Sequence, residues 1–173
     1  MAEDWVYVFV EIPKGSRNKY EYDPELRVFR LDRVLYSSVH YPADYGMIPG
    51  THAPDGDHLD ALVTVDEPNY PGTLVRARPV GVLRMRDEKG LDEKILGVPV
   101  DDPRYDPIAN LADLSPHWLR EIEAFFATYK LLQDVETKVE GWSDAAAAWD
   151  VIKRYTVSPA EDDDLFHAYR QPG

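Results

Sequence analysis

The strongest constraint on the fold is the way in which the first two thirds of the chain are interrupted. Up to about Asp102, a Gly, Pro, Asn or Asp recurs every few residues, and the segments between are rich in Val, Tyr, Phe and Ile. Such segments, bounded by turn residues, are typical of short strands. Val6, Val8 and Val10 would share one face of the first strand, which places Glu11 on the opposite face.

Later segments of this β-rich part carry more specific signals. Residues 72–85 predict a strand in which Pro79 marks an edge or a bulge, because proline has no backbone N–H to donate to a ladder. A hairpin is expected over residues 86–92, where Gly90 can supply the turn conformation, and the next strand follows over 93–98.

The last third of the chain predicts helices. Ser115 and Pro116 form an N-cap and first-turn pair, and apolar residues recur at three- and four-residue steps as far as Leu132. A second helix is expected from the cap Ser143 to about Tyr155, followed by a solvated tail over 156–173. The fold class is therefore mainly β (α+β), an antiparallel domain that forms a small barrel with two C-terminal helices packed on it. Residues 1–173 are expected to form a single domain with its core at about 5–155.

The charge balance excludes several functions. The 173 residues contain 32 Asp and Glu against 19 Lys and Arg, a formal charge of −13, and no cysteine. Disulfides, thiolate zinc sites and cysteine nucleophiles are thereby excluded, and the acidic surface should repel nucleic acid. The acidic N-terminus and the lack of a long apolar run predict neither export nor membrane insertion, so the expected location is the cytoplasm.

One acidic cluster leads directly into a buried segment. Asp55, Asp57 and Asp60 lie within six residues, and the aliphatic run 59–63 begins inside the cluster. Unpaired charge entering a core is costly, and a divalent cation is the usual compensation where carboxylates converge. The alternative is a solvated Asp-Gly turn, which is the commoner origin of such patterns. A calcium loop of the helix-loop-helix type is disfavoured because Leu59 and Asp60 occupy its fifth and sixth positions.

A second acidic group lies in the predicted hairpin. Asp87 and Asp92 flank its loop, and Asp92 shares a strand face with Lys94. Exposed hairpin charges often serve only solubility, which stays the alternative. Oxygen donors without cysteine or a close histidine pair favour Mg²⁺ or Mn²⁺ over Zn²⁺. Lys, Arg and Tyr residues are interleaved with the acids, and cations combined with several metal ions imply phosphate or diphosphate as ligand. Neither a P-loop nor a Gly-x-Gly-x-x-Gly pattern is present.

Six blocks of the sequence together resemble the soluble family I inorganic pyrophosphatases of prokaryotic type, over about residues 5–155. The blocks are residues 11–15 with 18–21, residues 41–46, residues 55–60, residues 81–88 with Asp92 and Lys94, residues 125–130, and residues 138–142. Three positions depart from the common pattern: His58 replaces a frequent Pro, Met47 an aromatic residue, and Leu131 an Asp. These departures bear on metal preference and subunit contacts rather than on the reaction.

The resemblance implies a five-stranded OB-like barrel, a homohexamer, and Mg²⁺-dependent hydrolysis of diphosphate to two orthophosphates by direct in-line attack of water. Several Mg²⁺ ions are implied per active site, for which Mn²⁺ can substitute. Metal ligands would be Asp55, Asp60 and Asp92 around the attacking water, Asp87 with Asp92 for an ion arriving with substrate, and Glu11 with Glu21 for a further ion. Asp57 would orient and deprotonate the water. Phosphate oxygens would be bound by Lys19, Arg33, Tyr45, Lys94, Tyr129 and Lys130, with Tyr41 in support.

Two other functions stay open at this point. A non-catalytic OB-type module for nucleic acid would use the tyrosines as stacking platforms, but the charge of −13 opposes it. A metal-dependent hydrolase of other phosphoanhydrides is disfavoured because no base-binding insertion is evident.

Overall fold

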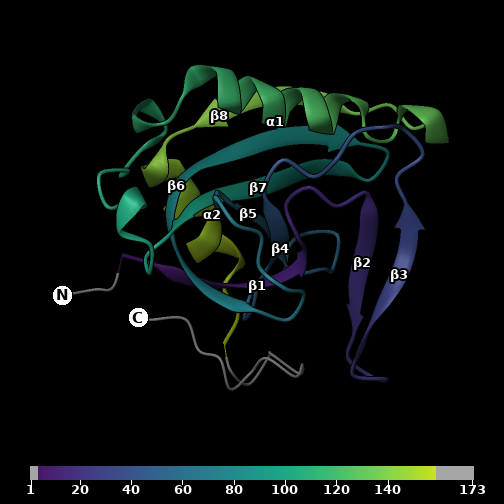
Figure 1. Cartoon of the computed structure of the whole chain (residues 1–173), viewed down its shortest axis with the longest axis horizontal. Helices are drawn as coiled ribbons and strands as arrows, with labels where there is room; N and C mark the ends of the chain where they lie inside the picture. The colour runs from purple at the N-terminus through teal and green to yellow at the C-terminus, as the bar shows by residue number, and fades with distance from the viewer. Residues whose placement is uncertain (1–3, 159–173) are drawn as a thin grey trace.

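Five strands close into a ring in the computed structural model, which describes residues 4–158 (Figure 1). Following the hydrogen bonds around the ring, its members are β1 (Val6–Ile12), β4 (Asp44–Ile48), β5 (Leu59–Val63), β7 (Gly90–Pro99) and β6 (Leu74–Asp87), and β6 pairs back to β1. This confirms the predicted five-stranded OB-like barrel. The expected antiparallel order is wrong at one place, since β5 and β7 run parallel.

Two further β elements lie outside the ring. β8 (Lys138–Ser143) extends the sheet along β6, and β2 (Asn18–Asp23) pairs with β3 (Val28–Val34) as a separate hairpin. The hairpin covers the outer face of β1, where Phe9 packs against Tyr22 and Phe29 with ring centroids 5.4 and 5.8 Å away. Glu11, the extra residue of a bulge between Val10 and Ile12, is also enclosed beneath the hairpin, where its Oε1 accepts from the Tyr22 N–H.

Two irregular positions shape the ring. The pairing of β6 with β7 shifts between Pro79 and Gly81, which confirms the expected bulge at the proline. Gly46 lets β4 cross β1 at close range, because a Cβ at this position would lie 1.9 Å from the carbonyl oxygen of Phe9. Only glycine fits such an approach of two backbones.

The helices differ from the sequence predictions at their ends. Helix α1 (Pro116–Thr128) stops before Leu132, and a separate 3-10 turn, η3 (Leu131–Gln133), follows it. Helix α2 (Ala145–Tyr155) is capped by Asp144, whose side chain accepts from the Ala147 N–H at 3.0 Å. The expected cap Ser143 is instead the last residue of β8, a strand that the prediction of an all-helical last third missed. Two more 3-10 turns, η1 (Pro103–Tyr105) and η2 (Leu111–Asp113), precede α1.

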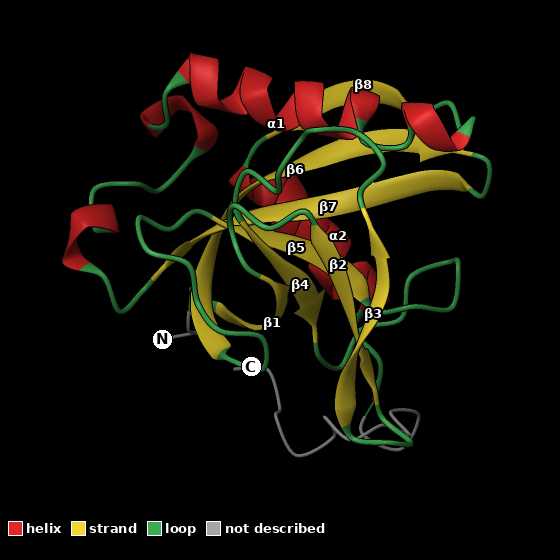
Figure 2. Cartoon of the chain, turned by 45° about the vertical axis from the view of Figure 1, so that its right-hand side comes forward, coloured by secondary structure: helices red, strands yellow, loops and turns green. Residues whose placement is uncertain are grey.

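The two helices cover different faces of the β6–β7 pair (Figure 2). Ile122, Phe125 and Phe126 of α1 pack in one core cluster with Leu83 and Met85, while α2 packs in a second cluster with Val82 and other inward-facing ring residues. None of the helices within residues 4–158 is long and apolar enough to cross a membrane. Most of the predicted tail, 159–173, lies outside the described residues.

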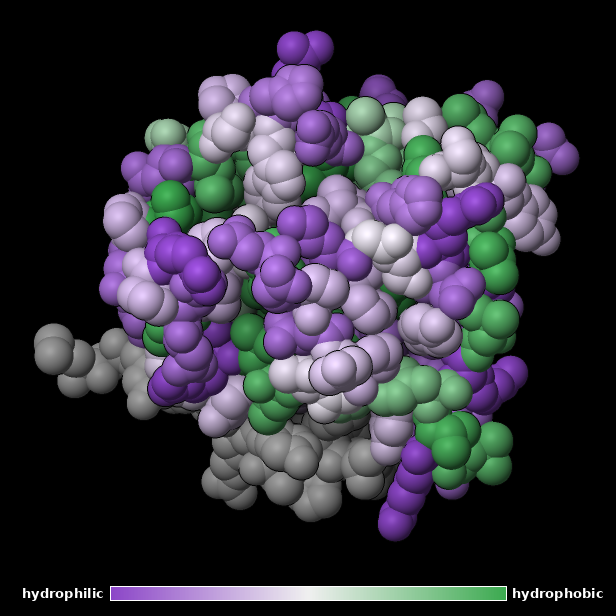
Figure 3. Space-filling model, viewed as in Figure 1, coloured by the Kyte–Doolittle hydropathy of each residue, from purple (hydrophilic) through white to green (hydrophobic). Residues whose placement is uncertain are grey.

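Several apolar side chains remain exposed on the β2–β3 hairpin. Leu31, Val34 and Tyr36 on or just after β3 are 54%, 45% and 59% exposed. Figure 3 shows hydrophobic side chains along the rim of the molecule on the side of this hairpin.

Candidate active site

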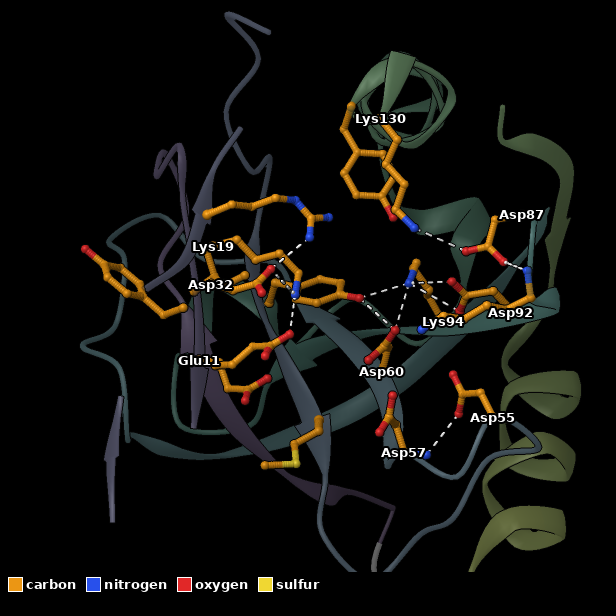
Figure 4. A pocket seen from close by; sticks show the side chains of 18 of the residues that line it. Glu11, Lys19, Asp32, Asp55, Asp57, Asp60, Asp87, Asp92, Lys94 and Lys130 are labelled. Carbon is orange, nitrogen blue, oxygen red and sulfur yellow. Dashed lines mark hydrogen bonds and ion pairs between the residues drawn. The ribbon is translucent and has the colours of Figure 1, made fainter. Parts of the chain in front are cut away.

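A cleft of about 570 Å³ opens between the β2–β3 hairpin, the strands of the ring and the end of α1 (Figure 4). It is lined by thirteen of the fourteen predicted site residues, which come from seven strands and two connecting segments. These residues are Glu11, Lys19, Glu21, Arg33, Tyr45, Asp55, Asp57, Asp60, Asp87, Asp92, Lys94, Tyr129 and Lys130. Residues more than 100 positions apart in sequence thus face one space.

Tyr41 is the predicted site residue that does not line the cleft. Its side chain is fully buried, with its ring centroid 5.3 Å from that of Tyr45 and 4.8 Å from that of Phe125. Burial raises the pKa of the Tyr41 phenol, so it stays protonated. Tyr41 therefore supports Tyr45 from behind, and the structure gives it no direct access to a ligand in the cleft.

Lys94 lies at the centre of the cleft floor. The parallel pairing of β5 and β7 places it opposite Asp60, and its Nζ is 2.8 Å from Asp60 Oδ2 and 3.0 Å from Asp92 Oδ2. It also donates to the Tyr45 hydroxyl at 2.9 Å and lies 5.1 Å from the centroid of the Phe126 ring. Burial disfavours the charged ammonium, but Asp60, Tyr45 and Asp92 outweigh it and raise the pKa of Lys94 well above its usual value. The cleft floor therefore keeps a fixed positive charge.

A second cation, Lys130, faces Asp87 across the cleft. Lys130 follows the C-terminal end of α1, and its Nζ lies 3.3 Å from Asp87 Oδ2. The other Asp87 oxygen accepts from the backbone N–H of Lys89 at 2.9 Å. Burial raises the pKa of Asp87, but the Lys89 N–H and Lys130 offset this and leave it below the ordinary value. Asp87 is therefore an ionised carboxylate at neutral pH.

The β2–β3 hairpin supplies a third group of charges, and one of them escaped the sequence analysis. Asp32 lies 3.3 Å from Lys19 Nζ and 2.8 Å from Arg33 Nη1, while Lys19 also pairs with Glu21 at 2.6 Å. In the pairing register Lys19 opposes Arg33 and the next residue opposes Leu31, so Asp32 is the extra residue of a bulge. A bulge turns neighbouring side chains toward one face, which simple alternation does not predict.

Several further cleft residues, among them Glu88, Lys89, Gln133 and His58, carried no role in the sequence analysis. Glu88 and Lys89 lie at the turn of the β6–β7 hairpin, and Gln133 follows α1. The sequence signal that could have identified these three residues as part of the site is their closeness in the chain to Asp87 and Lys130. His58, singled out only as a departure, also lines the cleft, and its Nδ1 lies 2.9 Å from the Thr51 carbonyl oxygen. A carbonyl can only accept, so Nδ1 donates to it and braces the loop in place of a proline ring.

The acidic loop between β4 and β5 is a tight turn. Gly56 has φ 89°, and the Asp57 N–H donates to Asp55 Oδ1 at 3.0 Å. Burial, followed by the charge of Asp55, raises the pKa of Asp57. On β1, burial raises the pKa of Glu11 to about 7, against the opposing hydrogen bond from the Tyr22 N–H. In both carboxyl groups the ionised form is disfavoured mainly because burial removes it from water.

This donor set fits hard divalent cations. Nine carboxylates line the cleft, the seven predicted ones together with Asp32 and Glu88, and no thiolate is present. Carboxylate oxygens are the donors that Mg²⁺ and Mn²⁺ prefer. Within residues 4–158, no three carboxylates or histidines lie close enough together to enclose an ion. Lys94 instead lies between Asp60 and Asp92, and Lys130 approaches Asp87. A bound cation would stabilise the ionised carboxylates of Glu11 and Asp57 and so lower their raised pKa values.

Comparison with known proteins agrees with this geometry. The family model described as inorganic pyrophosphatase matches residues 8–158. The chain belongs to the inorganic pyrophosphatase family. An inorganic pyrophosphatase of Synechocystis sp. is 50% identical over 148 residues, covering 86% of this chain and 88% of the relative, and one of Methanosarcina mazei is 51% identical, covering 86% and 90%. The crystal structure of the Thermus thermophilus enzyme superposes with a TM-score of 0.86 at 46% identity, covering 88% and 90%.

These matches confirm the family resemblance drawn from the sequence blocks. They also extend it, because the family model continues past residue 155 to 158. The structure gives the reason: Thr156 pairs with Thr51, and the Val157 N–H donates to the Gly50 carbonyl at 3.0 Å. The first residues after α2 thus belong to the folded unit rather than to a solvated tail. A divalent metal cofactor is general to this family, in keeping with the donor set of the cleft.

Proposed function

We propose that this chain hydrolyses inorganic diphosphate to two orthophosphates with Mg²⁺, by in-line attack of water and without a covalent intermediate. The observation that carries the proposal is the pairing of opposite charges in one cleft, where carboxylates that can hold cations face five lysine and arginine side chains. Diphosphate with bound cations presents the complementary pattern of negative oxygens and positive ions.

The metal-binding roles proposed here are those that the family resemblance implies. Asp55, Asp60 and Asp92 would hold two cations, Asp87 with Asp92 a third, and Glu11 with Glu21 a further one. A divalent cation supplies charge neutralisation and lowers the pKa of water in its coordination sphere. Mn²⁺ would substitute for Mg²⁺ because the donors are all oxygens.

The remaining cleft residues bind substrate and move a proton. Lys19, Arg33, Lys94 and Lys130 would donate to phosphate oxygens, as would the hydroxyls of Tyr45 and Tyr129. The positive charge of the lysine and arginine side chains stabilises the transition state, in which negative charge spreads over the oxygens of the transferred phosphoryl group. Asp57 would accept the proton of the attacking water at a carboxylate oxygen, and its raised pKa supports this role because a stronger base holds the proton better.

The cellular setting belongs to the same proposal. We infer a cytoplasmic enzyme, formed as one domain by residues 1–173, that binds neither nucleic acid nor membrane. The exposed apolar side chains of Leu31, Val34 and Tyr36 support self-association, and the assembly proposed is a homohexamer. A mass measurement in solution tests it, since a monomeric mass at micromolar concentration would contradict the assembly.

Phosphate release from diphosphate tests the proposed reaction. Wild-type protein with Mg²⁺ should release two phosphates per diphosphate, and excess EDTA should abolish turnover while the circular dichroism spectrum stays unchanged. Asp57→Asn should lower kcat by roughly 10²- to 10⁴-fold, the usual contribution of a general base. Asp150→Asn, on an exposed position of α2, is the matched control. Full activity of Asp57→Asn would remove the assigned base, and an EDTA-insensitive rate would refute the metal mechanism.

A further inference from the structure

A buried carboxylate lies behind the cleft, between two residues that face it. Glu93 separates Asp92 from Lys94 on β7, so its side chain points to the opposite face of the strand. That side chain is only 2% exposed. It accepts from Arg84 Nε at 3.1 Å and from the Tyr155 hydroxyl at 2.8 Å. Because neighbouring residues share a peptide plane, fixing Glu93 also restrains the backbone that carries Asp92 and Lys94.

Tyr155 is the last residue of α2. Its hydroxyl donates to Glu93, and its backbone is hydrogen-bonded to the start of the acidic loop. Its carbonyl oxygen accepts from the His52 N–H at 2.8 Å, and the next residue, Thr156, pairs with Thr51. Thr51 is fully buried, and its hydroxyl oxygen accepts from the Leu59 N–H at 2.9 Å at the far end of the loop. The start and the end of the segment that carries Asp55 and Asp57 are thus held together beside α2.

The loop and β7 approach each other around the Tyr155 side chain. A crevice of about 20 Å³ is lined by Tyr155 with Pro54, Asp55, Asp92 and Glu93, which leaves room for about one water molecule. In Figure 4 the coil of α2 lies beside the loop that carries Asp55. The packing is therefore tight enough for a change at Tyr155 to be felt by both segments.

We propose that Tyr155 is a positioning residue that sets the separation between the acidic loop and β7, and thereby the geometry in which Asp55, Asp60 and Asp92 meet a divalent cation. Its hydroxyl holds β7 through Glu93, and its backbone holds the loop. On the cleft side Lys94 already joins Asp60 to Asp92. The Tyr155 link connects the loop that carries Asp55 to this Asp60–Lys94–Asp92 group, because that loop is hydrogen-bonded to the end of α2. This inference rests on the metal-dependent function proposed above.

The chain offers a matched control for this link. The Tyr105 hydroxyl also donates to a carboxylate oxygen at 2.8 Å, that of Asp66, and neither residue lines the cleft. Tyr155→Phe and Tyr105→Phe each remove one hydroxyl from such a bond. A general loss of stability would therefore affect both variants, whereas a positioning role affects only Tyr155→Phe.

Calorimetric titration of the full chain with Mn²⁺, without substrate, measures cation affinity directly. Tyr155→Phe should bind Mn²⁺ about tenfold more weakly than wild type, the lower end of the loss typical for removing an outer partner of metal ligands. Tyr105→Phe should bind as wild type does, and both variants should melt within a few degrees of each other in EDTA. With diphosphate, saturating Mg²⁺ should restore kcat of Tyr155→Phe to within about twofold of wild type, because only the geometry of cation binding has changed.

Two results would overturn the positioning role: wild-type Mn²⁺ affinity in Tyr155→Phe, or an equal loss in Tyr105→Phe. A kcat that stays low at saturating Mg²⁺ would also contradict it, since the defect would then lie beyond cation binding. The titration is independent of the reaction. If the wild type binds Mn²⁺ but releases no phosphate, the proposed function fails while the affinity comparison still decides the role of Tyr155.

Discussion

Glu11 is the carboxylate whose environment gives the most quantitative prediction. It is enclosed beneath the β2–β3 hairpin, and burial, reinforced by the charge of Asp60, raises its pKa from 4.5 to about 7. Its Oε1 accepts from the Tyr22 N–H at 3.0 Å. Glu11→Gln keeps that acceptor and nearly the same volume but removes the charge, so the variant isolates the energetic effect of ionising this group.

The direction in which stability changes with pH follows from how tightly the native and the unfolded state each bind the Glu11 proton. In metal-free protein the native state holds the Glu11 proton more tightly than the unfolded chain does, so the native state loses relative stability as the pH rises from 4.5 to 7. The full shift corresponds to about 3 kcal/mol above pH 7. Glu11→Gln does not ionise, and it should therefore be more stable than wild type at pH 8 by about that amount. The two proteins should be nearly equal near pH 4.

Thermal unfolding in EDTA at a series of pH values measures the effect. A difference of about 3 kcal/mol corresponds to a melting temperature roughly 6–12 °C higher for Glu11→Gln at pH 8. Added Mg²⁺ should narrow the difference, because it stabilises the wild type more than a variant with one carboxylate fewer. If the two proteins lose stability in parallel between pH 4.5 and 7, the burial of an ionising Glu11 is not the cause and the reasoning is wrong.

Three further substitutions test other parts of the cleft and the fold. Lys94→Met should lower kcat/KM by roughly 10²- to 10³-fold in the phosphate-release assay, because it removes a fixed charge from the transition state; a loss below tenfold would contradict that role. Asp32→Asn should lower KM for diphosphate by about twofold to fivefold, since it releases Lys19 and Arg33 from partly exposed ion pairs; a raised KM would show that Asp32 aids binding. Gly46→Ala should cost roughly 3 kcal/mol or more in urea unfolding, because the new Cβ meets a backbone oxygen that cannot move aside; wild-type stability would refute the close approach.

Much of the architecture could be predicted from local patterns. The bulge at Pro79 and the turn at Gly90 follow from the shape and hydrogen-bonding capacity of single residues. β8 could not be predicted in this way. Its residues are largely polar and half-buried, and they form a strand because the free edge of β6 accepts them. Its formation therefore depends on a partner more than 50 positions away.

The sequence by itself determined the chemistry of the site, because residue types and their order carry the oxygen donors, the cations and the family blocks. Tertiary structure decided which of these groups meet. The parallel pairing of β5 with β7 places Lys94 against Asp60, the bulge in β3 turns Asp32 into the cleft, and packing places Tyr41 behind it. These outcomes depend on register and long-range packing, which are set when the whole chain closes its core and are not encoded in any local pattern.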